Sequence, residues 1–153
     1  MVSDDARQLT PKLIASLYTE AMLLADEARS YFDRHGRDER EALDPLLRVG
    51  FSCESLKVTT RLMHVIAWLL TQRAVEAGEI SAVHARNPAR RLGEAAASDP
   101  AQVARLPRNA IELIEASQEL YARVRRLDDG AVDGPEPQAS PARSLLSRLE
   151  RSF

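Results

Sequence analysis

The residues of this 153-residue chain that could do chemistry are three histidines and one cysteine, and their spacing argues against a metal site. His35, His64 and His84 lie far apart in the sequence. None of them follows a glutamate by three residues, the spacing with which carboxylate-bridged di-metal bundles hold their ions. A single cysteine can form neither an internal disulfide nor a multi-cysteine zinc site. We therefore expect no metal and no other cofactor.

Cys53 is expected to be a buried, inert thiol and not a nucleophile. It falls in the apolar series of the second predicted helix, where a small side chain packs well. The sequence also contains no glycine-rich phosphate loop and no nucleophile elbow. We therefore expect a protein that is not an enzyme.

Two arginine clusters are the remaining candidates for a binding site. Solvated surface, favourable contact with a helix C-terminus and ion pairing explain most such clusters, and docking of a nucleic acid or a protein is the alternative. The chain has 21 basic and 23 acidic residues, a mixture that does not draw it onto a polyanion. We therefore do not expect nucleic-acid binding. The two clusters are Arg86, Arg90 and Arg91, and Arg123, Arg125 and Arg126.

The composition predicts one all-α domain. Hydrophobic residues make up 44% of the chain, aromatic residues 5%, and there are 6 glycines, which is typical of helices and not of a sandwich or barrel. The N-terminus has no signal-peptide core, and the longest strongly apolar stretch, residues 65–70, is far too short to span a membrane. We expect a cytoplasmic protein that makes no membrane contact.

Three amphipathic segments at about 10–35, 45–77 and 107–128 predict the helices of one domain over residues 10–129. The first two begin with a capping residue followed by proline, Thr10-Pro11 and Asp44-Pro45. Apolar residues then recur at alternating intervals of three and four. We expect a three-helix antiparallel bundle, joined between the second and third helices by a connector with short helical turns.

The second helix is predicted to be apolar on more than one side. Leu62, Ile66 and Trp68 lie outside its regular apolar series, so we expect it to contact two neighbours and to leave enough apolar surface for a homodimer. Thr59 and Thr60 are expected to bond back to the preceding turn, and Trp68 to fill a groove between helices. The regular series, expected to face the core, is Val49, Cys53, Leu56, Thr60, Met63, Ala67, Leu70, Ala74 and Ala77.

Both ends of the chain are expected to lie outside the bundle. Residues 1–9 are predicted to be a flexible N-terminus, and residues 130–153 a disordered tail rich in glycine, proline and acid. The tail ends in a short amphipathic segment that is marginal as an isolated helix and is expected to order on binding. Its apolar face would contain Leu145, Leu146, Leu149 and Phe153.

Three stretches of the sequence resemble a known family. They are LYTEAMLLADEARSYFD from Leu17 to Asp33, CESLKVTTRLMHVIAWLLTQRAVEAGEIS from Cys53 to Ser81, and LIEASQELYARVRRLD from Leu113 to Asp128. In these stretches the chain resembles the RcdA (regulator of CtrA degradation) family of bacterial ClpXP protease adaptors. Together they cover most of the predicted helical domain, in order.

This resemblance implies a dimerising bundle that acts as a noncatalytic adaptor in regulated proteolysis, delivering cell-cycle regulators such as CtrA to ClpXP. The implied partners are ClpX, a CpdR-like response regulator, a PopA-like adaptor and substrate transcription regulators. The alternative is a small nucleic-acid-binding transcriptional regulator that uses the arginine clusters. If the first two helices are antiparallel, Glu20 and Glu27 would pair with Arg61 and Lys57 at the bundle edge. The candidate protein-binding residues are Glu54, Lys57, Arg61 and Arg73, with the four apolar residues of the terminal segment.

Overall fold

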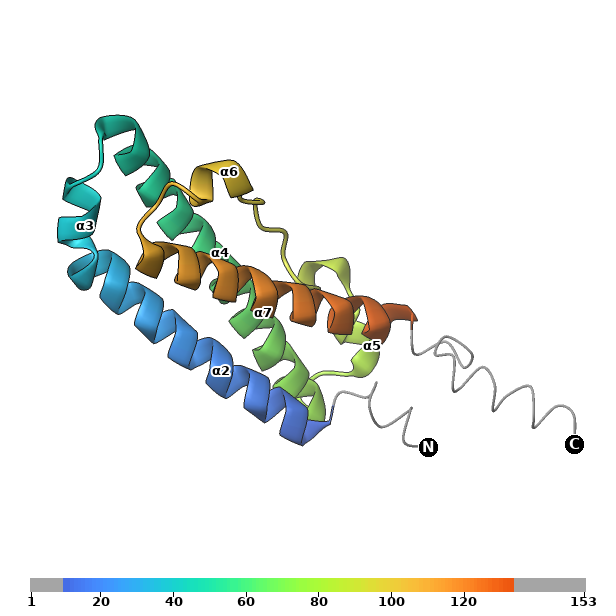
Figure 1. Ribbon diagram of the computed structural model, residues 1–153. Coiled ribbons are helices and arrows are strands. Elements are labelled where there is room, and N and C mark those ends of the chain that lie inside the picture. The colour runs from blue at the N-terminus through green and yellow to red at the C-terminus, as the bar shows by residue number, and fades with distance from the viewer. Residues whose placement is uncertain (1–9, 134–153) are drawn as a thin grey trace, which may run out of the picture.

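The computed structural model describes residues 10–133, which form helices and contain no strand, so the predicted all-α class is confirmed (Figure 1). Three long helices make up most of this part of the chain. They are α2 (Pro11–Ser30), α4 (Pro45–Glu76) and α7 (Arg108–Asp133). The shorter elements are the π-helix η1 (Tyr31–His35), α3 (Arg37–Glu41), α5 (Ala82–Ala85), the 3-10 helix η2 (Pro88–Arg90) and α6 (Pro100–Val103).

The first two long helices begin where their capping residues predict. The Thr10 hydroxyl accepts a hydrogen bond from the backbone N of Leu13, and the Asp44 carboxylate accepts one from the backbone N of Leu47, both at 3.0 Å. Each cap is followed by a proline, which has no N–H to satisfy at the first helical position. The third long helix extends to Asp133, so residues 130–133, expected in the tail, belong to α7.

The long helices do not alternate in direction, so the expected three-helix antiparallel bundle is not confirmed. Figure 1 shows α2 running against α4, whereas α7 runs in the same direction as α4. The contacts agree, because Arg61 bonds to Ser117 and, further along both helices, Trp68 bonds to Asp128. The connector over residues 77–107 is long enough to return the chain to the starting end of α4, which allows this parallel arrangement.

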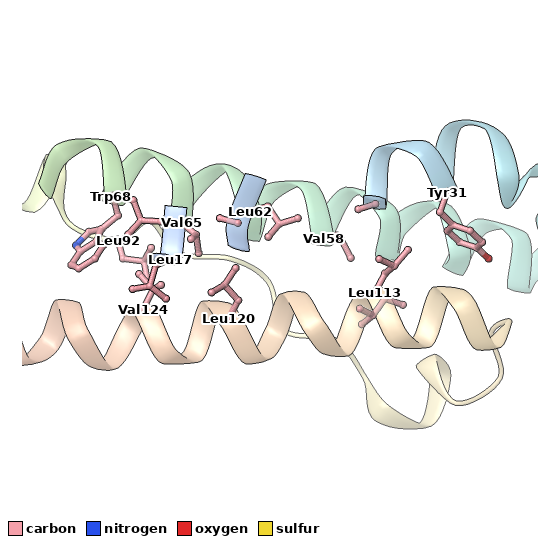
Figure 2. Packing of buried hydrophobic residues seen from close by; sticks show 14 of the residues in the cluster. Leu17, Tyr31, Val58, Leu62, Val65, Trp68, Leu92, Leu113, Leu120 and Val124 are labelled. Carbon is pink, nitrogen blue, oxygen red and sulfur yellow. The ribbon is translucent and has the colours of Figure 1, made fainter. Parts of the chain in front are cut away.

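The apolar core lies where the three long helices meet, and Figure 2 shows side chains from each of them pointing into it. Trp68 is buried at one end of this core, where it lies between α4, α7 and the connector residue Leu92. Thr59 and Thr60 face outward from it and donate to the carbonyls one turn earlier, at 3.0 and 2.9 Å, as predicted. The other core residues include Ile14, Leu17, Ala21, Val58, Leu62, Val65, Leu69, Leu113, Ile114, Leu120 and Val124.

The prediction of which α4 face packs inward is wrong. The regular series expected in the core faces outward, and Cys53, expected to be a buried thiol, is exposed. Because α4 is apolar on opposite sides, its periodicity cannot tell which side contacts α2 and α7. The side that does so also contains Glu54 and Arg61, charged residues that a simple polar and apolar pattern assigns to the surface. The buried residues of α4 are Phe51, Glu54, Val58, Arg61, Leu62, Val65, Trp68 and Leu69.

Candidate functional site

The outward face of α4 carries a regular row of apolar and small side chains. Its large members are strongly exposed, including Leu46 at 75%, Leu56 at 67% and Met63 at 63%. The positions alternate in steps of three and four, the spacing of a coiled-coil seam, which buries its apolar residues against another helix. We call this row the outer stripe, and it consists of Leu46, Val49, Cys53, Leu56, Thr60, Met63, Ala67 and Leu70.

The outer stripe is not interrupted by charge. Between residues 46 and 70, every residue of α4 that is fully exposed is uncharged. Arg48 and Lys57 are half-buried, while Glu54 and Arg61 are buried on the other side of the helix. At 1.5 Å per residue the stripe is about 36 Å long. An exposed apolar surface of this continuity marks a site of interaction with another macromolecule.

A groove between α2 and α4 adjoins the outer stripe. Its volume is about 480 Å³, and the small side chains of Ala25 and Ala28 leave space opposite Ser55 and Thr59. Met63 of the stripe forms part of its wall. The other residues that line it are Met22, Asp26, Arg29, Phe32, Asp33, Leu62 and Ile66.

The candidate residue Arg61 is buried and bonds within the chain. Its guanidinium donates to the Ser117 hydroxyl at 3.2 Å, to the Ala96 carbonyl at 3.1 Å and to the Ser98 hydroxyl at 2.6 Å. Burial lowers the pKa of Arg61, and the charge of Glu54 acts in the opposite direction. These contacts hold residues 92–99 of the connector, which we call the strap, against α4 and α7.

Two further candidates also bind the strap. The Ser98 hydroxyl donates to Glu54 at 2.5 Å, while Lys57 donates to Glu54 at 3.2 Å and to the Ala97 carbonyl at 3.0 Å. The fourth candidate, Arg73, is exposed and lies 5.0 Å from the ring centroid of Tyr18. Glu54, Lys57 and Arg61 thus bond inside the domain, and a docking role for these four residues stays a prediction.

The predicted ion pairs between α2 and α4 are wrong, because the charges involved have other partners. Glu20 pairs with Arg123 of α7, and this contact raises the pKa of Arg123. Lys57 pairs with Glu54 on its own helix. Glu27 forms no ion pair within residues 10–133.

A second set of contacts, at the far end of the strap, was not predicted. The Asp128 carboxylate accepts hydrogen bonds from Trp68 Nε1 at 2.8 Å, from Arg91 Nε at 3.2 Å and from the backbone N of Leu92 at 3.3 Å. One signal was present in the sequence, because a buried tryptophan N–H needs an acceptor. Nothing in the sequence indicated that the acceptor lies 60 residues further along the chain.

Much of the charge in the two arginine clusters is neutralised within the domain. Arg91 pairs with Asp128 at 3.1 Å and Asp129 at 3.0 Å, and Arg125 pairs with Glu94 at 3.1 Å. Arg123 pairs with two glutamates. Ion pairing at these three arginines reduces the excess positive charge on which phosphate binding depends, so the nucleic-acid alternative is not favoured.

Neither a metal cluster nor a membrane span is found in the described part of the chain. Within residues 10–133 no three histidine, cysteine, aspartate or glutamate side chains are placed to hold a metal ion. Across the same residues no helix has both the length and the apolar character required to cross a membrane. Leu145, Leu146, Leu149 and Phe153 lie outside the described residues.

Comparisons with known proteins identify a family and a similar crystal structure. Residues 5–153 match the family described as protein of unknown function (DUF1465). The crystal structure of RcdA from Caulobacter crescentus CB15 is 36% identical in sequence, with a TM-score of 0.63, and the match covers 78% of this chain and 91% of that one. No curated protein matches the chain.

Proposed function

The chain belongs to the DUF1465 family and is RcdA-like, and from this premise we propose that it is a noncatalytic adaptor in regulated proteolysis. In this role it brings cell-cycle regulators, with CtrA as one candidate, to the ClpXP protease. Its proposed partners are ClpX, a CpdR-like response regulator, a PopA-like adaptor and the substrate transcription regulators, all in the cytoplasm. An adaptor needs no catalytic chemistry of its own, because holding the substrate near the protease raises the effective concentration of the substrate there.

The observation that carries this proposal is the outer stripe. About 36 Å of the surface of α4 is apolar and carries no exposed charge. Such a surface supports binding to another protein. Three charged residues of α4 instead bond to the strap, namely Glu54, Lys57 and Arg61. The exposed surface of α4 therefore supports protein binding and not catalysis.

We propose that the outer stripe is the contact surface of a homodimer. A second copy supplies an identical seam of matching length, and the same patch on both copies closes a two-fold interface. Small side chains at Cys53, Thr60 and Ala67 alternate with the larger Leu56, Met63 and Leu70, which lets two α4 helices approach closely. This arrangement leaves α7, the strap and Arg73 free for other partners.

A reconstituted degradation assay tests the adaptor role. Purified ClpXP, a CpdR-like regulator and a fluorescently labelled cell-cycle regulator are combined with and without this chain, and loss of the label is followed over time. We expect the chain to accelerate ATP-dependent degradation without being needed for degradation of an adaptor-independent substrate. Failure to accelerate any candidate cargo, together with no binding to ClpX or to the regulator, would contradict the proposal.

A mobility-shift measurement separates the alternative. The adaptor proposal predicts that the chain does not retard duplex DNA at 150 mM salt. A retardation that weakens steeply as salt increases would favour the nucleic-acid role instead.

A further inference from the structure

The groove between α2 and α4 has the form of a receptor for an amphipathic helix. Its floor contains the buried side chains of Ala28 and Leu62, and its walls include the exposed side chains of Met22 and Met63. A volume of about 480 Å³ accommodates several apolar side chains from one face of a helix. The small residues of both helices keep this space open instead of filling it.

The rim of the groove favours a basic ligand. Asp26 of α2 and Asp33 of η1 are exposed at this rim, about two helical turns apart. Arg29 is the basic residue between them, and it pairs with Asp26 at 3.4 Å. Asp33 forms no ion pair within the described part of the chain. A matching ligand therefore combines leucine or aromatic residues on one helical face with arginine beside them.

Residues 143–153 of this same chain, RSLLSRLERSF, have that composition. Leu145, Leu149 and Phe153 follow one another at intervals of four, so a helix places them on one face. Arg148 lies beside that face, and three arginines against one glutamate give the segment a net positive charge. We propose that residues 143–153 dock as a short helix in the α2–α4 groove of the same molecule.

The intervening chain is long enough to reach. Trp68 bonds to Asp128, so the end of α7 at Asp133 lies about 7 Å further along the bundle than Trp68. The near end of the groove, at Ile66, is then roughly 10 Å back along the axis and one or two helix widths around the bundle. Residues 134–142 span about 30 Å when extended, which exceeds this path.

Methionine methyl signals provide a direct test, because the chain has only 3 methionines: Met1 and, in the groove wall, Met22 and Met63. The full-length chain is labelled with ¹³C at the methionine methyl groups and compared with two tail variants. Leu149→Glu puts a charge on the proposed docking face, whereas Ser147→Glu puts the same charge on the opposite face. All spectra are also taken with Leu56→Glu, so that self-association cannot move the Met63 signal.

We expect Leu149→Glu to shift the signals of Met22 and Met63 but not that of Met1, and Ser147→Glu to shift none. Added synthetic peptide 143–153 should return the two signals of the Leu149→Glu chain to their original positions. Identical spectra for the two variants would overturn the proposal, as would a shift of Met63 alone, which places the segment on the outer stripe. A shift that disappears on dilution would show docking between molecules and overturn docking in cis. The degradation assay tests the adaptor role separately, so the two can fail independently.

Discussion

The indole Nε1 of Trp68 donates a hydrogen bond of 2.8 Å to the carboxylate of Asp128, joining α4 to α7. Both residues are buried. The same carboxylate accepts the backbone N–H of Leu92 and pairs with Arg91, so one side chain joins two long helices and the connector. This contact lies nearer to the C-terminal ends of α4 and α7 than the contact between Arg61 and Ser117 does.

Asp128→Ala is expected to destabilise the domain by about 2–4 kcal/mol, because it leaves the indole N–H and the Leu92 N–H buried without an acceptor. Urea unfolding followed by Trp68 fluorescence measures this change, since Trp68 is the single tryptophan. Asp129→Ala is the matched control, because the Asp129 side chain is 55% exposed. Equal stability of the two variants would contradict a stabilising role for the buried Asp128 carboxylate.

Arg61→Leu is expected to cost about 3 kcal/mol of unfolding free energy, since it removes the hydrogen bonds of the buried guanidinium and leaves Lys57 as the one positive charge beside the buried Glu54. The double variant Arg61→Leu with Glu54→Leu should recover part of this loss, because it also removes the buried negative charge. Chemical denaturation of the single and double variants measures the coupling. If the double variant is destabilised by the sum of the two single effects, the two residues are not coupled.

Tyr31→Phe is expected to change the stability of the domain little at neutral pH. At alkaline pH the variant is expected to lose less stability than the wild-type chain. Burial, with a further contribution from Glu39, raises the pKa of Tyr31 above the ordinary value of about 10. Above that pH the unfolded chain releases this proton while the folded chain retains it, so stability falls as pH rises. The difference in unfolding free energy between wild type and Tyr31→Phe at pH 8 and pH 10.5 measures the effect. The same difference in unfolding free energy at both pH values would contradict the raised pKa of Tyr31.

Gly93→Ala and Gly50→Ala are predicted to have opposite effects. A Cβ at Gly93 would overlap the imidazole ring of His64, so the strap or the imidazole must move, at a cost of about 1–3 kcal/mol. A Cβ at Gly50 meets nothing within 4 Å, and alanine there should stabilise α4 by about 0.5–1 kcal/mol. Thermal unfolding of both variants checks the pair, and a stabilising Gly93→Ala would contradict the close packing of the strap.

The elements with local signals could be predicted from the sequence. Thr10 and Asp44 fix the starts of α2 and α4 by capping chemistry that involves only the next three residues. The strap could not be predicted, because its anchors, such as the contact between Tyr121 and the Gly93 carbonyl, depend on tertiary structure. The direction of α7 was missed for a related reason, since a long connector allows the chain to enter the third helix from either end.

The orientation of α4 was the most consequential error. The series through Leu56 and Met63 has the more regular apolar spacing, so periodicity alone favours burying it. The core instead uses the side that includes Glu54 and Arg61, whose charged groups form hydrogen bonds with the strap. A regular apolar face that the domain leaves uncovered is itself the signal for an external partner.

Sedimentation equilibrium tests most directly whether the outer stripe binds a second copy of the chain. We predict a dimer mass for the wild-type chain at tens of micromolar, and a monomer mass for Leu56→Glu, which places a charge in the middle of the stripe. Val83→Glu, an equally exposed apolar position at 66% on α5, should leave the dimer intact. A monomeric wild-type chain, or a Leu56→Glu variant that still dimerises, would contradict the assignment of this surface.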